Sequence, residues 1–312
     1  MSAVPRVERR RSPVVLHETV SDALIEQVRE DGFGVLAGAL SPAEVAEINA
    51  EAVRLCRGDL GEIHGVEPAE VDESDVDVMR RYLCIHFPNK LSEVIARSLH
   101  HPRIVEALTK VIGPNVKAMQ SMLFMKAEGK PGQAWHQDEF FIPTRDRSLT
   151  AVWIALDDAT IENGCLWVLP GSHRRGVIYP DRDQDDERFD CTVELYDFPY
   201  RDEDAVPVEI PAGSAVIFNG YLLHRSLPNT GQRAPGGAGS SPGWHGRRAL
   251  ANHYMSAESL LPWHQVPDGM HVAKWDFRDI ELVAGEDPYA YKGTIDVAKP
   301  GVRPDKEGGC GR

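Results

Sequence analysis

Short apolar segments separated by glycine, proline and aspartate dominate the chain from residue 115 onward. They lie at residues 116–126, 149–156, 165–169, 215–218 and 249–255. Several short strands at this spacing are typical of an antiparallel β-sandwich or barrel. Such a chain must bury its apolar residues between β layers, so we predict a mainly β fold with its core in this part of the sequence.

The N-terminal part differs, because its apolar residues recur at helical spacing. Ser41 is a helix-capping residue, Pro42 suits the first helical position, and Glu44 completes a capping box. A helix that starts with the amphipathic stretch at Ser21 should stop at Asp31-Gly32. We predict helices at 21–30, 41–56, 91–99 and 102–112, a short strand at 33–36, and a surface loop at 62–77.

The 312 residues fit one large domain with appended helices. We predict a flexible tail at 1–20, a single domain at 21–295 and a disordered tail at 296–312. Within the domain we expect a helical part (21–113), a β-rich core (115–257) and a C-terminal cover (258–295). Two polar segments, 174–206 and 231–246, are candidate lids over a site.

Charge and hydropathy exclude several kinds of partner. A net charge of −14 argues against nucleic acid, because binding to the phosphate backbone needs clustered lysine and arginine. No stretch approaches the roughly 20 apolar residues of a membrane span, and no signal-peptide core follows Met1. We expect a cytoplasmic protein that binds neither nucleic acid nor membranes, and whose five widely spaced cysteines are reduced thiols.

Two histidines and one aspartate indicate a metal site. His136 and Asp138 are two positions apart, so on a strand both side chains would point to the same face. This spacing alone is weak evidence, since a surface histidine beside an aspartate is usually only solvated. His224 closes the apolar run 215–223, where a histidine can equally be a packed core residue. Two histidines and one carboxylate together can form the facial triad that leaves positions open on Fe(II) for an oxoacid and O₂.

An enzyme that uses 2-oxoglutarate must also hold the far carboxylate of that molecule. A guanidinium does so with two parallel hydrogen bonds. Arg247 and Arg248 begin a β-like run, and neighbouring residues of a strand face opposite ways. Only one of the two can therefore enter the site.

Five motifs of this chain resemble the phytanoyl-CoA dioxygenase family of Fe(II)/2-oxoglutarate oxygenases, and the resemblance extends over residues 24–261. The motifs are Trp135-His136-Gln137-Asp138, Trp153-Ile154-Ala155-Leu156-Asp157-Asp158, Glu162-Asn163-Gly164-Cys165-Leu166, Leu169-Pro170-Gly171-Ser172-His173 and His224-Arg225-Ser226-Leu227-Pro228-Asn229. The resemblance implies a double-stranded β-helix, or cupin-like jelly roll, with helices packed outside it. It also implies Fe(II), 2-oxoglutarate as cosubstrate, and O₂.

Matched position by position, the resemblance assigns roles to single residues. It places the catalytic iron on His136, Asp138 and His224. Arg247 would grip the far carboxylate of 2-oxoglutarate, and Ser226 would supply a hydroxyl.

Three more matched residues are expected to line the cosubstrate pocket: Gln120, Gln137 and Trp153. The interval between His224 and Arg247 is longer than is usual in the family, because it contains a glycine-rich loop at 233–243. Loop insertions cost little free energy. The longer interval nevertheless leaves Arg248 and Arg233 open as alternatives.

Two other histidines receive structural interpretations. His173 lies in a Pro-Gly-Ser-His turn and is predicted to hydrogen-bond a loop. His253 lies on a predicted strand, either as a packed residue or as a support for the iron ligands.

These residues predict a 2-oxoglutarate-dependent dioxygenase that hydroxylates, or otherwise oxidises, a small organic molecule and releases succinate and CO₂. Asp138 favours hydroxylation, desaturation or ring formation, since related halogenases replace this carboxylate with a small residue. No basic cluster suggests coenzyme A, so a free small molecule is preferred as substrate. A metal-dependent hydrolase or lyase with the same ligands, and a non-catalytic jelly-roll binding protein, are the alternatives.

Overall fold

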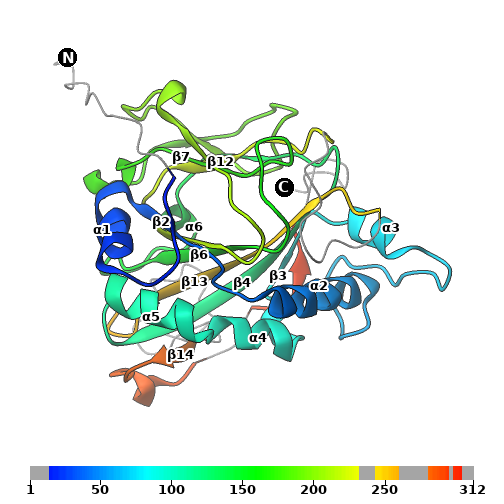
Figure 1. Cartoon of the computed structure of the whole chain (residues 1–312), viewed down its shortest axis with the longest axis horizontal. Coiled ribbons are helices and arrows are strands. Elements are labelled where there is room, and N and C mark those ends of the chain that lie inside the picture. The colour runs from blue at the N-terminus through cyan, green and yellow to red at the C-terminus, as the bar shows by residue number, and fades with distance from the viewer. Residues whose placement is uncertain (1–13, 232–242, 260–279, 295–297, 304–312) are drawn as a thin grey trace, which may run out of the picture.

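The computed structural model describes residues 14–231, 243–259, 280–294 and 298–303, and Figure 1 shows their arrangement. In these ranges the helices are α1 (Asp22–Asp31), α2 (Pro42–Arg57), α3 (Asp75–Arg80), α4 (Glu93–Leu99), α5 (Pro102–Val111) and α6 (Asp138–Phe141). The strands are β1 (Leu16–His17), β2 (Phe33–Leu36), β3 (Cys84–His86), β4 (Val116–Lys126), β5 (Gln133–His136), β6 (Thr150–Ala155), β7 (Leu166–Val168), β8 (Asp181–Arg182), β9 (Glu194–Leu195), β10 (Val206–Val208), β11 (Ala215–Asn219), β12 (His224–Ser226), β13 (Arg247–Ser256), β14 (Glu281–Ala284) and β15 (Gly301–Val302).

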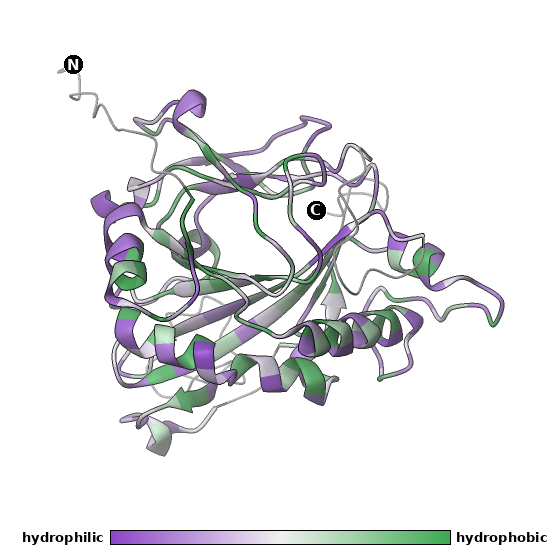
Figure 2. Ribbon diagram, in the orientation of Figure 1, coloured by the Kyte–Doolittle hydropathy of each residue, from purple (hydrophilic) through white to green (hydrophobic). Residues whose placement is uncertain are grey.

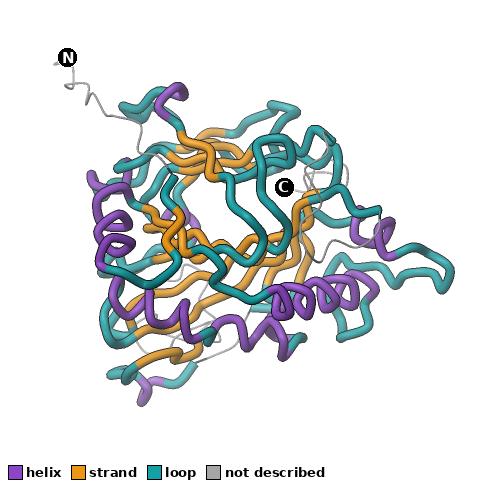
Figure 3. Tube along the Cα trace, viewed as in Figure 1, coloured by secondary structure: helices purple, strands orange, loops and turns teal. Residues whose placement is uncertain are grey.

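The strands form two main sheets that face each other (Figure 3). In the described residues the larger sheet has nine strands in the order β1-β2-β11-β6-β13-β4-β3-β15, with β14 also paired to β4. The smaller sheet has the order β10-β7-β12-β5, and β8 and β9 form a separate pair. Apart from the parallel pair β1–β2, the strand pairs are antiparallel. This is the predicted jelly-roll core.

The central strands of the larger sheet, such as β6 and β11, are buried on both faces, because each face packs against a different layer. On β11, Ala215 and Ile217 face a core shared with the helices, whereas Val216 and Phe218 face the core between the two sheets. In Figure 1, α2, α4 and α5 cover the face turned away from β7 and β12. A strand with two buried faces is apolar throughout instead of alternating in polarity.

The helices begin and end as the capping residues require. Ser41 and Glu44 form the predicted capping box of α2, and Ser21 caps α1. Gly32 ends α1 with φ 84°, a left-handed conformation that favours glycine. Figure 2 shows hydrophilic and hydrophobic residues alternating along α2, whose apolar residues pack against the larger sheet.

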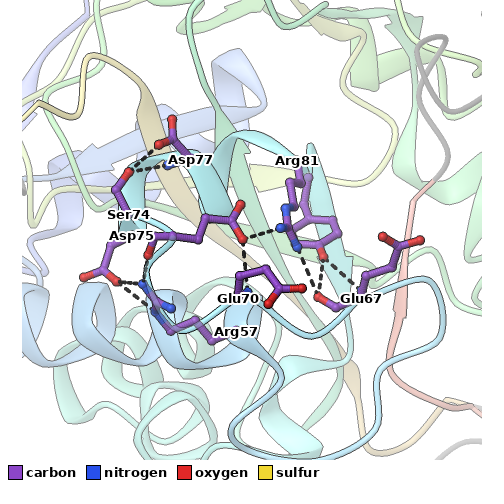
Figure 4. A network of polar contacts seen from close by, with 9 residues as sticks. Arg57, Glu67, Glu70, Ser74, Asp75, Asp77 and Arg81 are labelled. Atoms are coloured by element: carbon purple, nitrogen blue, oxygen red, sulfur yellow. Dashed lines mark hydrogen bonds and ion pairs between the residues drawn. The ribbon is translucent and has the colours of Figure 1, made fainter.

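The acidic segment 62–77 is not entirely a loop, which corrects the sequence prediction. The helix α3 starts within it, because Ser74 accepts a hydrogen bond from the backbone N–H of Asp77 and so caps the first turn. Arg57 binds Asp75 through Nε and Nη2 at 2.8 and 2.6 Å, which ties α2 to α3 (Figure 4). Arg81 also pairs with Glu73.

Each of the two segments predicted as tails contributes a short strand. The strand β1 pairs with β2 through Leu16 and Val35. At the other end, β15 pairs with β3, itself a strand that the sequence reading missed. Local pattern reading cannot find two-residue or three-residue strands, because only the neighbouring strand stabilises them.

The segment 174–206 holds the pair β8–β9 and a 3₁₀ turn at Asp202–Asp204, while most of the glycine-rich loop at 233–243 lies outside the described residues. Cys56, Cys84 and Cys165 are free and buried. Cys191 is disulfide-bonded, which corrects the expectation that every cysteine is reduced. None of the described helices is both long and apolar enough to cross a membrane.

Candidate active site

The two candidate histidine ligands lie side by side because their strands pair in register. On β12 and β5, His224 is the direct partner of His136, and their ring centroids are 3.9 Å apart. Each Nδ1 donates to a backbone carbonyl two residues earlier, Ala134 at 2.8 Å and Leu222 at 2.9 Å. These bonds fix the tautomer and turn both Nε2 atoms toward the same point.

Asp138 reaches this point from a helix, not from a strand as the sequence reading assumed. The strand β5 ends at His136, and Asp138 is the first residue of α6. Its Oδ1 lies 3.8 Å from His136 Nε2 and 3.6 Å from His224 Nε2. One ligand atom from each residue falls within 4.8 Å of the others, so the three fit around a single metal ion.

Electrostatics favour the protonation states that bind a metal ion. Burial, followed by the neighbouring His224, lowers the pKa of His136 well below its usual range. Burial alone would raise the pKa of Asp138, but His224, His253 and His136 outweigh it and hold that pKa well below its usual range. His136 is therefore a neutral imidazole and Asp138 a carboxylate at neutral pH.

A second polar group lies at another part of the same cavity and is cationic. Arg247 on β13 and Lys126 on β4 are register partners, and both are buried. Lys126 Nζ donates to Ser226 Oγ and to Leu227 O, each at 2.8 Å. Burial first, and then Arg247, lowers the pKa of Lys126 well below its usual range. A charged guanidinium beside a buried amine that can take up a proton makes this end of the cavity suited to an anion.

The Arg247 guanidinium is held in place, but not all of its N–H groups form hydrogen bonds. Its Nη2 donates to Gly164 O at 2.7 Å, and it lies over the Trp153 ring at 5.0 Å from the centroid. Its Nε has no hydrogen-bond partner among the described residues. Burial lowers the pKa of Arg247 to about 10, so the group still carries its charge at neutral pH. Free donors on a buried guanidinium suit a carboxylate ligand.

Gly164 shows why the Glu162-Asn163-Gly164 motif lies beside this cationic end. Gly164 has φ 80°, and a Cβ on it would lie 2.4 Å from Leu227 O and 2.9 Å from Lys126 Cδ. Asn163 holds the turn by accepting from the Thr160 N–H at 2.8 Å and donating to Asp158 O at 2.7 Å. A side chain at position 164 would therefore displace the groups that position Lys126.

The other predicted residues separate into two groups. Gln120, Trp153 and Ser226 line the cavity together with the candidate metal ligands and Arg247. Gln137 does not line it: its Nε2 donates to Val177 O and Tyr221 O, and its Oε1 accepts from the Tyr179 N–H. Gln137 therefore connects two loops by hydrogen bonds, whereas the sequence had predicted that it lines the cosubstrate pocket. Arg233 lies outside the described residues.

Sequence reasoning missed Lys126 and left His253 undecided. His253 lines the cavity and contacts Asp138, whereas His173 lies outside the cavity and donates from Nε2 to Arg29 O. Lys126 could have been found from strand alternation, because Gln120, Met122, Phe124 and Lys126 share one face of β4.

The cavity that holds these groups has a volume of about 360 Å³. Aromatic and aliphatic side chains make up much of its wall: Leu83, Phe87, Met122, Phe124, Phe141, Ile142, Leu166 and Phe218. Arg225 and Arg303 also line it, and each pairs with an aspartate, Asp202 at 2.7 Å and Asp190 at 3.3 Å. The cavity thus combines a metal-binding cluster, a cationic end and an apolar wall.

A buried two-histidine, one-carboxylate cluster inside a jelly roll is the arrangement of mononuclear non-haem iron oxygenases. The profile of the phytanoyl-CoA dioxygenase (PhyH) family matches residues 28–235, more than half of the chain, and the chain belongs to this family.

Curated relatives agree with the family assignment. Phytanoyl-CoA dioxygenase 1 of Oryza sativa subsp. japonica is 41% identical over 113 residues, which cover 36% of this chain and 39% of the rice protein. The chain thus spans about two fifths of that relative. Phytanoyl-CoA dioxygenase domain-containing protein 1 of Danio rerio is 28% identical over 260 residues, covering 68% of this chain and 86% of the fish protein.

Solved structures share the fold at low sequence identity. The non-heme monooxygenase ThoJ in its apo form is 22% identical with a TM-score of 0.60, covering 91% of this chain and 88% of ThoJ. The epimerase SnoN, in complex with Fe³⁺, alpha ketoglutarate and nogalamycin RO, is 22% identical with a TM-score of 0.56, covering 86% of this chain and 96% of SnoN. Both neighbours share the fold of this chain, and the SnoN structure holds iron and alpha ketoglutarate.

Proposed function

We propose that this chain is an Fe(II)- and 2-oxoglutarate-dependent dioxygenase that hydroxylates, or otherwise oxidises, a small organic molecule with release of succinate and CO₂. One observation carries the proposal: the His136, Asp138 and His224 cluster shares a single cavity with the cationic pair Lys126 and Arg247. A metal cluster and a separate anion site in one cavity suit a ligand with a chelating end and a carboxylate end.

In this proposal the three clustered side chains hold the iron, which when bound supplies the activation of O₂ coupled to oxidative decarboxylation of the oxoacid. Arg247 and Lys126 bind the far carboxylate of 2-oxoglutarate, and Ser226 adds a hydroxyl. The ring face of Trp153 packs against the guanidinium of Arg247. The apolar wall excludes water from the reacting groups and contacts the substrate.

The cationic pair favours an oxygenase over a metal-dependent hydrolase or lyase. Such an enzyme could use the same three ligands, but its chemistry gives no reason to bury two basic side chains beside them. A binding protein without turnover would have no need for the depressed pKa of His136 or for a buried carboxylate between two imidazoles. A free small molecule as substrate and a cytoplasmic location stay predictions.

The proposal is tested by anaerobic titration of Fe(II)-loaded protein with 2-oxoglutarate, observing the weak visible charge-transfer band of an iron–oxoacid chelate. We expect the band in the unmodified protein, none in His136→Ala, and a requirement for higher 2-oxoglutarate concentrations in Arg247→Ala. His173→Ala is the matched control, because its imidazole lies outside the cavity and contacts the Arg29 carbonyl. A folded, iron-loaded protein without the band would contradict the proposal and favour the hydrolase or the binding protein.

A further inference from the structure

We propose that His253 and Gln120 form a positioning pair that restricts Asp138 to one metal-binding oxygen. The inference rests on the proposed metal site, and it concerns residues that do not themselves touch the metal. His253 lies on β13 and Gln120 on β4, and both side chains are buried and line the cavity.

The two oxygens of Asp138 have different neighbours. Oδ1 is the oxygen that faces His136 and His224, at 3.8 and 3.6 Å from their Nε2 atoms. Oδ2 lies 3.1 Å from His253 Nε2. The carboxylate is therefore divided between a metal-facing oxygen and an oxygen held by an imidazole.

Gln120 determines which nitrogen of His253 carries the proton. The Gln120 amide nitrogen lies 3.3 Å from His253 Nδ1, and an amide NH₂ can only donate. Nδ1 of His253 must then accept, so the proton of the neutral ring is on Nε2. His253 Nε2–H donates to Asp138 Oδ2, and a directed chain runs from Gln120 through His253 to the carboxylate.

These two hydrogen bonds affect how many coordination positions of the metal stay open. Two histidines and a carboxylate bound through one oxygen leave three of six positions free, enough for a bidentate oxoacid and O₂. A carboxylate bound through both oxygens would leave only two. By holding Oδ2, His253 keeps the third position available and fixes the rotation of the Asp138 side chain.

An irregularity in the register of β4 and β13 brings His253 and Gln120 together. His253 and Gln120 are direct partners, but the next pair is Tyr254 with Ala118, so β4 has a bulge at Met119. Before the bulge Ala118 faces the helices, and after it Gln120 faces the cavity. The bulge aims the Gln120 amide at the face of β13 that carries His253.

The experiment measures Co(II) binding by calorimetry and visible absorption, because the Co(II) spectrum reports coordination number without turnover. We expect His253→Leu to bind Co(II) about 10- to 100-fold more weakly and with an altered spectrum. His253→Gln, which can still present an N–H to Asp138, should recover part of the affinity. Tyr254→Phe is the control on the same strand: its hydroxyl bonds Leu99 O on the helix side, so Co(II) binding should not change.

Gln120→Leu is the second variant in case His253→Leu fails to fold. It removes the donor that sets the His253 tautomer and should shift the Co(II) spectrum in the same direction, with a smaller loss of affinity. Wild-type affinity and spectrum in folded His253→Leu, or in Gln120→Leu when the first is unfolded, would overturn the inference. An unmodified protein that binds Co(II) but gives no 2-oxoglutarate band on iron would instead contradict the proposed function alone.

Discussion

Arg247 and Arg248 are adjacent in the chain, yet their guanidinium groups lie on opposite faces of β13. Arg247 lies in the cavity over Trp153, with its ζ carbon 5.0 Å from the ring centroid. Arg248 points toward the helices and binds Asp157 through Nε at 2.9 Å and Nη2 at 2.7 Å. One arginine is thus available to a ligand, and the other completes a buried ion pair.

Replacement of each arginine by alanine should therefore have different effects. Arg247→Ala should weaken 2-oxoglutarate binding by about 2 kcal/mol or more, roughly thirtyfold, with a small effect on unfolding. Arg248→Ala removes the cation that balances the buried charge of Asp157 and should lower the free energy of unfolding by about 3–5 kcal/mol. Urea unfolding and 2-oxoglutarate titration of both variants check this, and a reversed pattern would mean that the roles are exchanged.

Binding of 2-oxoglutarate should be accompanied by proton uptake at Lys126. Burial and Arg247 hold the pKa of Lys126 well below its usual range, and a carboxylate between the two side chains favours the charged amine and raises that pKa. Calorimetry of the iron-loaded, anaerobic protein in buffers of different ionisation enthalpy measures the uptake. Lys126→Met should abolish it and weaken binding by about 10-fold or more. A binding enthalpy that is the same in every buffer would refute this role.

Gln137 should matter for stability more than for cosubstrate affinity. Gln137→Ala removes the hydrogen bonds to Val177, Tyr179 and Tyr221 and should lower the free energy of unfolding by about 1–3 kcal/mol. Because Gln137 lies outside the cavity wall, the affinity of the metal-loaded protein for 2-oxoglutarate should change little. If affinity fell as far as it does in Arg247→Ala, Gln137 would belong to the pocket after all.

Glu139 should make the metal-free protein less stable as pH rises. Burial raises the pKa of Glu139 to about 7, although hydrogen bonds from Thr144 oppose the shift. The folded state therefore binds more protons than the unfolded state between about pH 4.5 and 7. Its stabilising effect is complete below this window and is lost as pH rises through it, a change of about 1–3 kcal/mol.

The comparison for Glu139 is with Glu139→Gln, which keeps an oxygen that accepts from Thr144 but cannot ionise. Urea unfolding at about pH 5 and pH 8 should show a larger loss of stability in the unmodified protein than in this variant. Equal pH dependence of the two proteins would assign the effect to other groups.

Much of the architecture could be predicted from local sequence patterns. Helix starts at Ser21 and Ser41 were readable because capping is a local interaction between residues three positions apart. Apolar runs between turn residues predicted the longer strands of the larger sheet, and motifs with their spacing gave His136, Asp138 and His224 as candidate ligands. The clustering of these three side chains agrees with that prediction.

The face of the sheet that each residue occupies depends on pairing between distant strands. Every residue of β13 except the last is buried, so its polarity does not alternate and cannot distinguish Arg247 from Arg248. The bulge at Met119 reverses the faces along β4, which no local pattern reveals. Asp138 lies in α6 and not on the predicted strand, because β5 ends at His136, where its pairing with β12 ends. Local chemistry selects the residues, and the register between distant strands determines where their side chains meet.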